Sequence, residues 1–357
     1  MIANPKCLLT AQKTQDEIEK TLLRALGEMQ TEEEYHNHPF ISNSNLKTLE
    51  QSPRLFHQEK IQGESDDDQS RFMKLGSMID TMLLEPHQFQ SRYVEEPSDL
   101  KEPYSSKEKD FCEAYQNGHT AEEAYREVYS TNGKSDEKIR EKAQKKLDKF
   151  EAYFQFQEEI EEGGRTPYSS DEHQKAMNVF YDIQNHRKAQ AFLSPPRHQV
   201  QHKEAQMVIP FVQNGVFCRS MLDWVVVGQD RIISIDLKTT SKQLSSFDYW
   251  YRRRRYYRQQ AMYRRALEYK YRGTDYEDLP VATYVIAAHT KEPHETIVRR
   301  IDNALLRQGE QELDTLLDHL KFHIENDVWR RRPKYYQTND VSVIQHDESE
   351  ILPLNLQ

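Results

Sequence analysis

Two acidic residues and a lysine accompany a predicted pair of β-strands, and they constrain the fold more than any other feature. Asp223 precedes the apolar stretch 224–227, residues 228–230 are typical of a turn, and a second strand leads into Asp236-Leu237-Lys238. Side chains alternate along a strand, so Asp236 and Lys238 share one face. The paired strands therefore bring two carboxylates and one ammonium together. This arrangement suits Mg²⁺ beside a water that attacks a phosphodiester.

Other motifs accompany this strand pair in a fixed order along the chain. They are Ser-x-Ser-x-Leu-Lys at 42–47 with Ser-Pro at 52–53, Gly76 with Leu-Glu-Pro at 84–86, Ile-Asp-Leu-Lys-Thr-Thr at 235–240, and Gln-x-x-x-Tyr at 259–263. In this order they resemble the PD-(D/E)XK nuclease superfamily, and within it the RecE-type exonuclease VIII family. The resemblance covers about residues 41–90 and 165–335.

The resemblance implies roles for the residues around the strand pair. Asp223 and Asp236 would be the metal-bridging carboxylates, Lys238 would position or polarise the attacking water, and the backbone carbonyl of Leu237 would be a further ligand. Glu204 stands where the family has a Glu that faces the metal site. The predicted catalytic residues are thus Lys238, Asp236, Asp223 and Glu204. For Glu204 the other interpretation is an exposed residue at a strand end.

Asp80 departs from the family pattern. The family has a metal-binding His four residues after the glycine at position 76, and this chain has a carboxylate there. Aspartate is a suitable, harder ligand for Mg²⁺. Asp80 is therefore predicted to bind the metal; the alternative is that this ligand position is lost and Asp80 is a solvated or capping residue.

The segment 249–265 reverses the acidic character of the chain. It holds seven arginines and no acid, interleaved with aromatic residues. Guanidinium groups and aromatic rings suit phosphate contact and base stacking. Helical spacing puts Gln259, Tyr263 and Tyr256 on one face of a helix, so all three can face the same groove. We predict DNA contact through these three residues and through Arg252 and Arg255. The alternatives are pairing of this face with acidic residues of an insertion, or a subunit contact.

Composition limits the classes of protein that remain. The chain has 357 residues, a formal net charge of -10 and 36% hydrophobic residues. A protein that coats nucleic acid over its whole surface would be basic, so any DNA contact must be local. We expect no membrane span and no signal peptide, and hence a cytoplasmic protein of a bacterial or phage-infected cell. Three dispersed cysteines indicate free thiols and argue against an iron–sulfur cluster.

The predicted fold is α/β, with a PD-(D/E)XK (restriction-endonuclease-like) core. A mixed central sheet is flanked by helices and carries a helical insertion. The sequence pattern predicts one helix over 246–270, a strand at 281–288, a helix over 301–325 and a helix-capping box formed by Thr120 and Glu123. The expected parts are an N-terminal helical extension (1–40), the first part of the nuclease domain (41–96), a charged helical insertion (97–165), the nuclease core (166–335) and a mobile polar tail (336–357). Within the insertion, 111–130 is weakly similar to the helix-turn-helix of small phage terminase subunits; a surface helical hairpin is the other interpretation.

The predicted function is Mg²⁺-dependent hydrolysis of DNA phosphodiesters, with Mn²⁺ as a substitute metal. The resemblance implies a 5′→3′ exonuclease that acts on double-stranded DNA ends in phage-type recombination or repair. It also implies a homo-oligomeric ring and a strand-annealing recombinase as partner. Two alternatives stay open at this point. One is a structure-specific endonuclease of the same superfamily, and the other is a DNA-binding or assembly protein that has lost catalysis.

Overall fold

The computed structural model describes residues 4–63, 71–98 and 100–333. The chain divides into two compact units, of which the first combines Met1–Ser70 with Ile183–Gln357 and the second is Arg71–Asp182. The predicted mobile tail lies outside the described residues. Among the helices that are described, none has the length and apolar character needed to cross a lipid bilayer.

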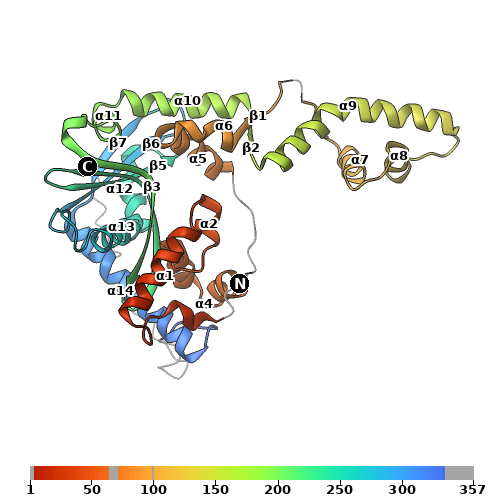
Figure 1. Cartoon of the computed structure of the whole chain (residues 1–357). Coiled ribbons are helices and arrows are strands. Elements are labelled where there is room, and N and C mark those ends of the chain that lie inside the picture. Colours follow the sequence, from red (N-terminus) through yellow and green to blue (C-terminus); the bar gives the residue numbers. More distant parts are fainter. Residues whose placement is uncertain (1–3, 64–70, 99, 334–357) are drawn as a thin grey trace, which may run out of the picture. The chain divides into compact units, whose positions relative to one another are not determined.

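A five-stranded mixed sheet forms the centre of the first unit (Figure 1). Its strands, in spatial order, are β3 (Val200–Gln213), β4 (Val216–Gly228), β5 (Ile232–Thr240), β6 (Val281–His289) and β7 (Thr296–Arg300). β5 and β6 are parallel, and the other neighbours are antiparallel. The prediction of a mixed sheet is confirmed.

Local sequence explains the two kinds of strand connection. Asn214 and Gly215 join β3 to β4 with φ values of 48° and 75°, as a two-residue hairpin turn with positive φ at both positions requires. A parallel pair needs a longer crossover, which α12 (Phe247–Arg253) and α13 (Tyr256–Lys270) supply between β5 and β6. The sequence predicted one helix over 246–270, which is wrong. Arg255 adopts a left-handed conformation, with φ of 55°, and separates the two helices.

Helices cover both faces of the sheet. The main core joins β3 and β4 to α13 and to α14 (Asn303–Asn326), and includes the buried residues Leu222, Ala261 and Leu317. A second cluster packs α1 (Gln15–Glu28) and α2 (Glu32–Asn37) around Phe217 on the other side. The remaining α-helices of this unit are α3 (Asn43–Gln51), α4 (Pro53–Phe56) and α11 (Arg187–Leu193).

The second unit is mainly helical. Its two short parallel strands are β1 (Tyr93–Glu95) and β2 (Thr166–Tyr168), and its helices are α5 (Arg71–Leu84), α6 (Phe89–Arg92), α7 (Ser106–Gln116), α8 (Ala121–Val128), α9 (Asp136–Gly163) and most of α10 (Ser170–Asn185). Thr120 and Glu123 form the capping box that the sequence predicted for α8. α7, α8 and α9 share a core of their own that contains Phe111, Tyr125 and Phe150. The predicted insertion, 97–165, therefore lies within this unit.

Candidate active site

The candidate site lies where β4 and β5 part. Their ladder runs from Val227↔Ile232 to Trp224↔Ile235, and the next residues on the two strands are Asp223 and Asp236. The Leu237 backbone N–H donates to Asp223 Oδ2 at 2.8 Å. The carboxylate of Asp223 thus takes the place that a backbone carbonyl has further along the ladder.

Asp236 and Lys238 meet as their two-residue spacing predicts. Lys238 Nζ donates to Asp236 Oδ1 at 2.7 Å and to the Leu237 carbonyl oxygen at 3.3 Å. The Asp236 side chain is completely buried, whereas that of Lys238 is 21% exposed. The ammonium therefore bridges a buried anion and the exterior, where a substrate can reach it.

Burial makes ionisation of both carboxyl groups costly. Burial, followed by the charge of Asp236, raises the pKa of Asp223 to about 7, against the opposing effect of Lys238. The pKa of Asp236 is also raised, mainly by burial. The Gln260 amide approaches Asp236 and opposes this rise, although it falls short of a well-formed hydrogen bond. A further positive charge would favour ionisation of both groups.

The donor groups fit a divalent cation. Asp236 Oδ2 is buried and accepts no hydrogen bond from any described residue, which is a costly state for an anionic oxygen. Two carboxylates and the Leu237 carbonyl are the oxygen donors that Mg²⁺ prefers. Across the described parts of the chain, no three His, Cys, Asp or Glu residues gather closely enough to hold a metal alone. The metal would therefore need oxygen donors beyond this pair of carboxylates.

The first half of α13 faces this strand pair. Gln259 Nε2 donates to the Tyr263 hydroxyl at 2.7 Å. Burial, then the charges of Asp223 and Asp236, hold the pKa of Tyr263 well above its usual value, so the phenol stays protonated beside both acids. The Tyr256 ring lies 5.6 Å from Lys238 Nζ. The structure thus brings all three predicted aromatic and amide residues of α13 to the site.

The arginines between 249 and 265 divide into two groups. Arg252 and Arg253 are exposed on α12, and so is Arg254, which follows the helix. Four others form ion pairs with acids of α3 and α14: Arg255 and Arg258 with Glu50, Arg264 with Glu310, and Arg265 with Asp314. The partners of these four lie outside the predicted insertion. Arg252 is free of such a pairing acid in the described structure, whereas Arg255 is held by one.

Two predicted ligands are not brought to the strand pair by the described contacts. Glu204 lies on β3 opposite Val225, and its carboxylate is 3.0 Å from His202 Nε2. Burial raises the pKa of Tyr271, eight residues beyond Tyr263, and the charge of Glu204 adds to this rise. Asp80 lies on α5 in the second unit. Their roles as metal ligands stay predictions.

Sequence reasoning missed two residues that border the site. Burial raises the pKa of Tyr35 of α2 to about 12, and the charge of Asp223 contributes to this rise. The Arg219 guanidinium lies 4.6 Å from the centre of the Tyr35 ring. Gln260, the neighbour of the Gln-x-x-x-Tyr motif residue Gln259, is completely buried. Gln260 could have been identified from the sequence, because it is a polar residue next to the apolar pair Ala261-Met262 in the predicted helix. No local sequence pattern distinguishes Tyr35 as a residue of the site.

Known proteins provide an independent view of the chain. A similar solved structure is a crystal structure from Eubacterium rectale of a protein named there a "putative exonuclease", with 11% identity and a TM-score of 0.49 over 91% of this chain and 98% of the other. No curated protein matches the sequence. A family model described as "PDDEXK-like domain of unknown function (DUF3799)" matches residues 42–334. The chain therefore belongs to this family, and the predicted membership of the PD-(D/E)XK nuclease superfamily is confirmed.

Proposed function

We propose that this protein is a metal-dependent deoxyribonuclease that hydrolyses DNA phosphodiester bonds. One observation supports it most. Asp223, Asp236 and Lys238 converge where two strands part, and a buried carboxylate oxygen there has no hydrogen-bond partner among the described residues. A nuclease of this superfamily needs that combination of carboxylates and ammonium.

The residues of the chain have separate roles in this proposal. Asp223, Asp236 and the Leu237 carbonyl would hold Mg²⁺ or Mn²⁺, and Asp80 and Glu204 are proposed to complete the ligand set. When bound, the cation supplies Lewis-acid activation of water and neutralises charge on the leaving oxygen. Lys238, fixed by Asp236 and the Leu237 carbonyl, orients the attacking water and donates to a phosphate oxygen.

The residues of α12 and α13 hold the DNA strand. Tyr256 borders the Lys238 ammonium, Gln259 is bonded to Tyr263 beside the two acids, and the exposed Arg252 offers a charged contact to a phosphate. The Tyr263 hydroxyl fixes the Gln259 amide through its hydrogen bond. These side chains set which phosphodiester lies over Lys238.

The motif order supports a more specific proposal. Its similarity to the RecE-type family favours a 5′→3′ exonuclease on double-stranded DNA ends, acting in phage-type recombination or repair. A homo-oligomeric ring and a strand-annealing recombinase partner belong to the same proposal. They depend on the resemblance of motifs such as 235–240 and 259–263, and each needs its own test.

The first test is digestion of linear duplex DNA labelled at either end, with Mg²⁺ and with EDTA. We expect Mg²⁺-dependent nucleotide release from the 5′ end. Lys238→Met should reduce the rate by about 10²-fold or more, because the water and phosphate lose their ammonium. Lys203→Met is the control, since the Lys203 ammonium of β3 lies over the Trp224 ring of β4.

Other outcomes would identify the alternatives. Cleavage of circular duplex as fast as of linear duplex would contradict an exonuclease and favour a structure-specific endonuclease. DNA binding without digestion in Mg²⁺ or Mn²⁺ would contradict the enzyme proposal and favour a protein that has lost catalysis.

A further inference from the structure

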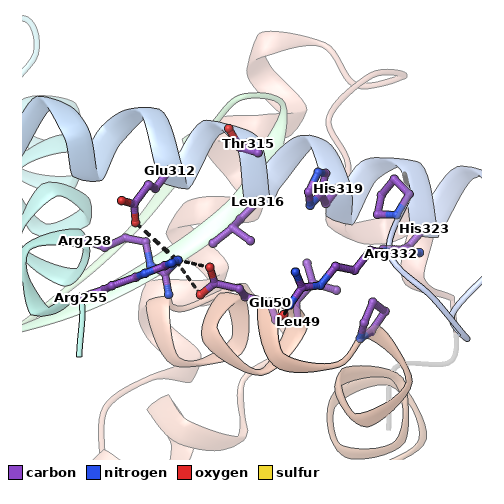
Figure 2. Close-up of a pocket in the computed structure, with 12 residues that line it drawn as sticks. Leu49, Glu50, Arg255, Arg258, Glu312, Thr315, Leu316, His319, His323 and Arg332 are labelled. Atoms are coloured by element: carbon purple, nitrogen blue, oxygen red, sulfur yellow. Dashed lines mark hydrogen bonds and ion pairs between the residues drawn. The ribbon is translucent and has the colours of Figure 1, made fainter. Parts of the chain in front are cut away.

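A cavity of about 170 Å³ lies in the first unit beside the start of α13 (Figure 2). Its walls come from the end of α3, the first turn of α13, the middle of α14 and the segment at 332–333. Pockets for drug-sized ligands span roughly 300–1,000 Å³, so this one suits a smaller group. The charged residues that line it are Arg255, Arg258, Arg332, Glu50 and Glu312.

The Glu50 carboxylate pairs with two of the three guanidinium groups in this cavity. Arg258 Nη1 donates to Glu50 Oε2 at 2.9 Å, and Arg255 also pairs with the Glu50 carboxylate. Arg332 Nη2 donates to the Glu50 backbone oxygen at 2.6 Å. Glu312 Oε2 is 3.9 Å from both Arg255 and Arg258, too far for a hydrogen bond. Three guanidinium groups therefore face two carboxylates.

The cavity also keeps an unused buried donor. The Arg258 side chain is 2% exposed, and its Nε has no hydrogen-bond partner among the described residues. Burial and the charge of Arg332 lower the pKa of His319, so its imidazole is neutral near pH 7 and does not change the balance of charge in the cavity. Glu312 Oε2 is likewise buried without a hydrogen-bond partner among the described residues, but three guanidinium groups against two carboxylates leave the lining with a net positive charge. A net positive charge and a buried N–H without an acceptor are features of a site for an anion.

This cavity adjoins the candidate active site through α13. Arg255 directly precedes Tyr256, whose ring lies 5.6 Å from Lys238 Nζ. Arg258 directly precedes Gln259, which is bonded to Tyr263. The first two turns of one helix thus present one set of side chains to the acids and another to the cavity.

We propose that this pocket binds a phosphate group, and that the Glu50 carboxylate is an internal occupant that the phosphate displaces. A phosphate offers the several oxygen acceptors that Arg255, Arg258 and Arg332 can share. It could come from the end of a DNA strand, which rests on the proposed function, or from free inorganic phosphate. Either source uses the same three guanidinium groups.

The test is calorimetric titration of inorganic phosphate in EDTA, at an ionic strength held constant with sodium chloride. Glu50→Gln should bind phosphate about tenfold more tightly than the wild type, because the competing carboxylate is gone. Arg332→Gln should bind about tenfold more weakly, since one charge-assisted hydrogen bond is lost. Glu310→Gln is the matched control: Glu310 of α14 pairs with Arg264 of α13 and does not line the cavity.

A second arm distinguishes the sources of the phosphate. Oligonucleotide duplexes with and without a terminal phosphate are titrated under the same conditions. A preference for the phosphorylated end that Arg332→Gln removes would identify the DNA end. Equal binding of the two duplexes, with free phosphate still sensitive to the variants, would identify inorganic phosphate.

One pair of results would overturn the proposal. Glu50→Gln would bind phosphate no better than the wild type, and Arg332→Gln would leave the affinity unchanged. Glu50 would then be a structural ion-pair partner of Arg255 and Arg258 only. Because no cleavage is measured, this failure is separate from failure of the proposed nuclease activity.

Discussion

Lys60 is a partly buried cation with a cation as neighbour. Its Nζ donates to the His38 carbonyl oxygen at 2.7 Å. Burial, then the charge of Arg219, lowers the pKa of Lys60 from 10.5 to about 7. The folded state then binds fewer protons than the unfolded state between these two values. The free energy of unfolding should therefore rise with pH from about 7 to 10.5.

Lys60→Met tests this reasoning. The variant should be more stable than the wild type at pH 7 by about 1 kcal/mol, because the gain from removing the charge exceeds the lost hydrogen bond. The advantage should shrink as the pH approaches 10. Urea unfolding at both pH values measures it, with the exposed Lys47→Met as control. An advantage that stays constant with pH would contradict the lowered pKa.

Single residues also show what the sequence can and cannot predict about the site. The contact of Asp236 with Lys238 follows from the two-residue period of a strand, so spacing alone predicts it. The pairing of Arg255 with Glu50 joins residues 205 positions apart, and no local pattern carries that information. The same is true of Tyr35 beside Asp223.

The contact of α13 with α14 depends on a glycine. A Cβ at Gly309 would lie 2.9 Å from both the Ala261 Cβ and the Tyr257 carbonyl oxygen. Such distances force the helices apart. Since α13 carries Tyr256 and Gln259, this contact also sets how that helix meets the strand pair.

Gly309→Ala should lower the free energy of unfolding by about 1–3 kcal/mol, despite the higher helix propensity of alanine. Gly27→Ala on α1 is the matched control. A Cβ there meets nothing within 4 Å, so the same substitution should stabilise by up to about 1 kcal/mol. Thermal and urea unfolding of both variants give the comparison. A stabilising Gly309→Ala would mean that α14 is free to move away from α13.

Helices and strands were predictable to the extent that local periodicity determines them. The predicted strand at 281–288 agrees with β6, and the predicted helix at 301–325 agrees with α14. The break between α12 and α13 was not predicted, because the segment 252–255 has no Gly or Pro to signal it. The short strand β7 was also missed; it completes the sheet by pairing with β6.

At the scale of the molecule, charge is segregated. The chain has 49 basic and 59 acidic residues, yet the segment 249–265 contains seven arginines and no acidic residue. Its arginines are divided between ion pairs and solvent: Arg264 is held by Glu310, and Arg252 is exposed. Sequence composition predicts the basic segment, but only the fold decides which of its charges remain available.

This division predicts how DNA binding depends on salt. Arg252→Gln should weaken duplex binding and reduce the slope of log affinity against log salt by about one. Arg264→Gln should leave the slope unchanged, because that guanidinium is already neutralised by Glu310. Binding in EDTA over a range of salt concentrations measures both. Equal slopes for Arg252→Gln and the wild type would show that α12 makes no phosphate contact.

The hydrogen bond between the Leu237 amide and Asp223 Oδ2 makes one proton a reporter of the whole site. Elsewhere in the β4–β5 ladder, exchange of an amide with solvent deuterium requires the strands to separate. At Leu237 it requires only that a side chain turn away. Exchange at this position therefore follows the orientation of the Asp223 carboxylate rather than the stability of the sheet. The exchange rate of this single amide thus reports whether the Asp223 carboxylate accepts a hydrogen bond from the backbone or binds a ligand instead.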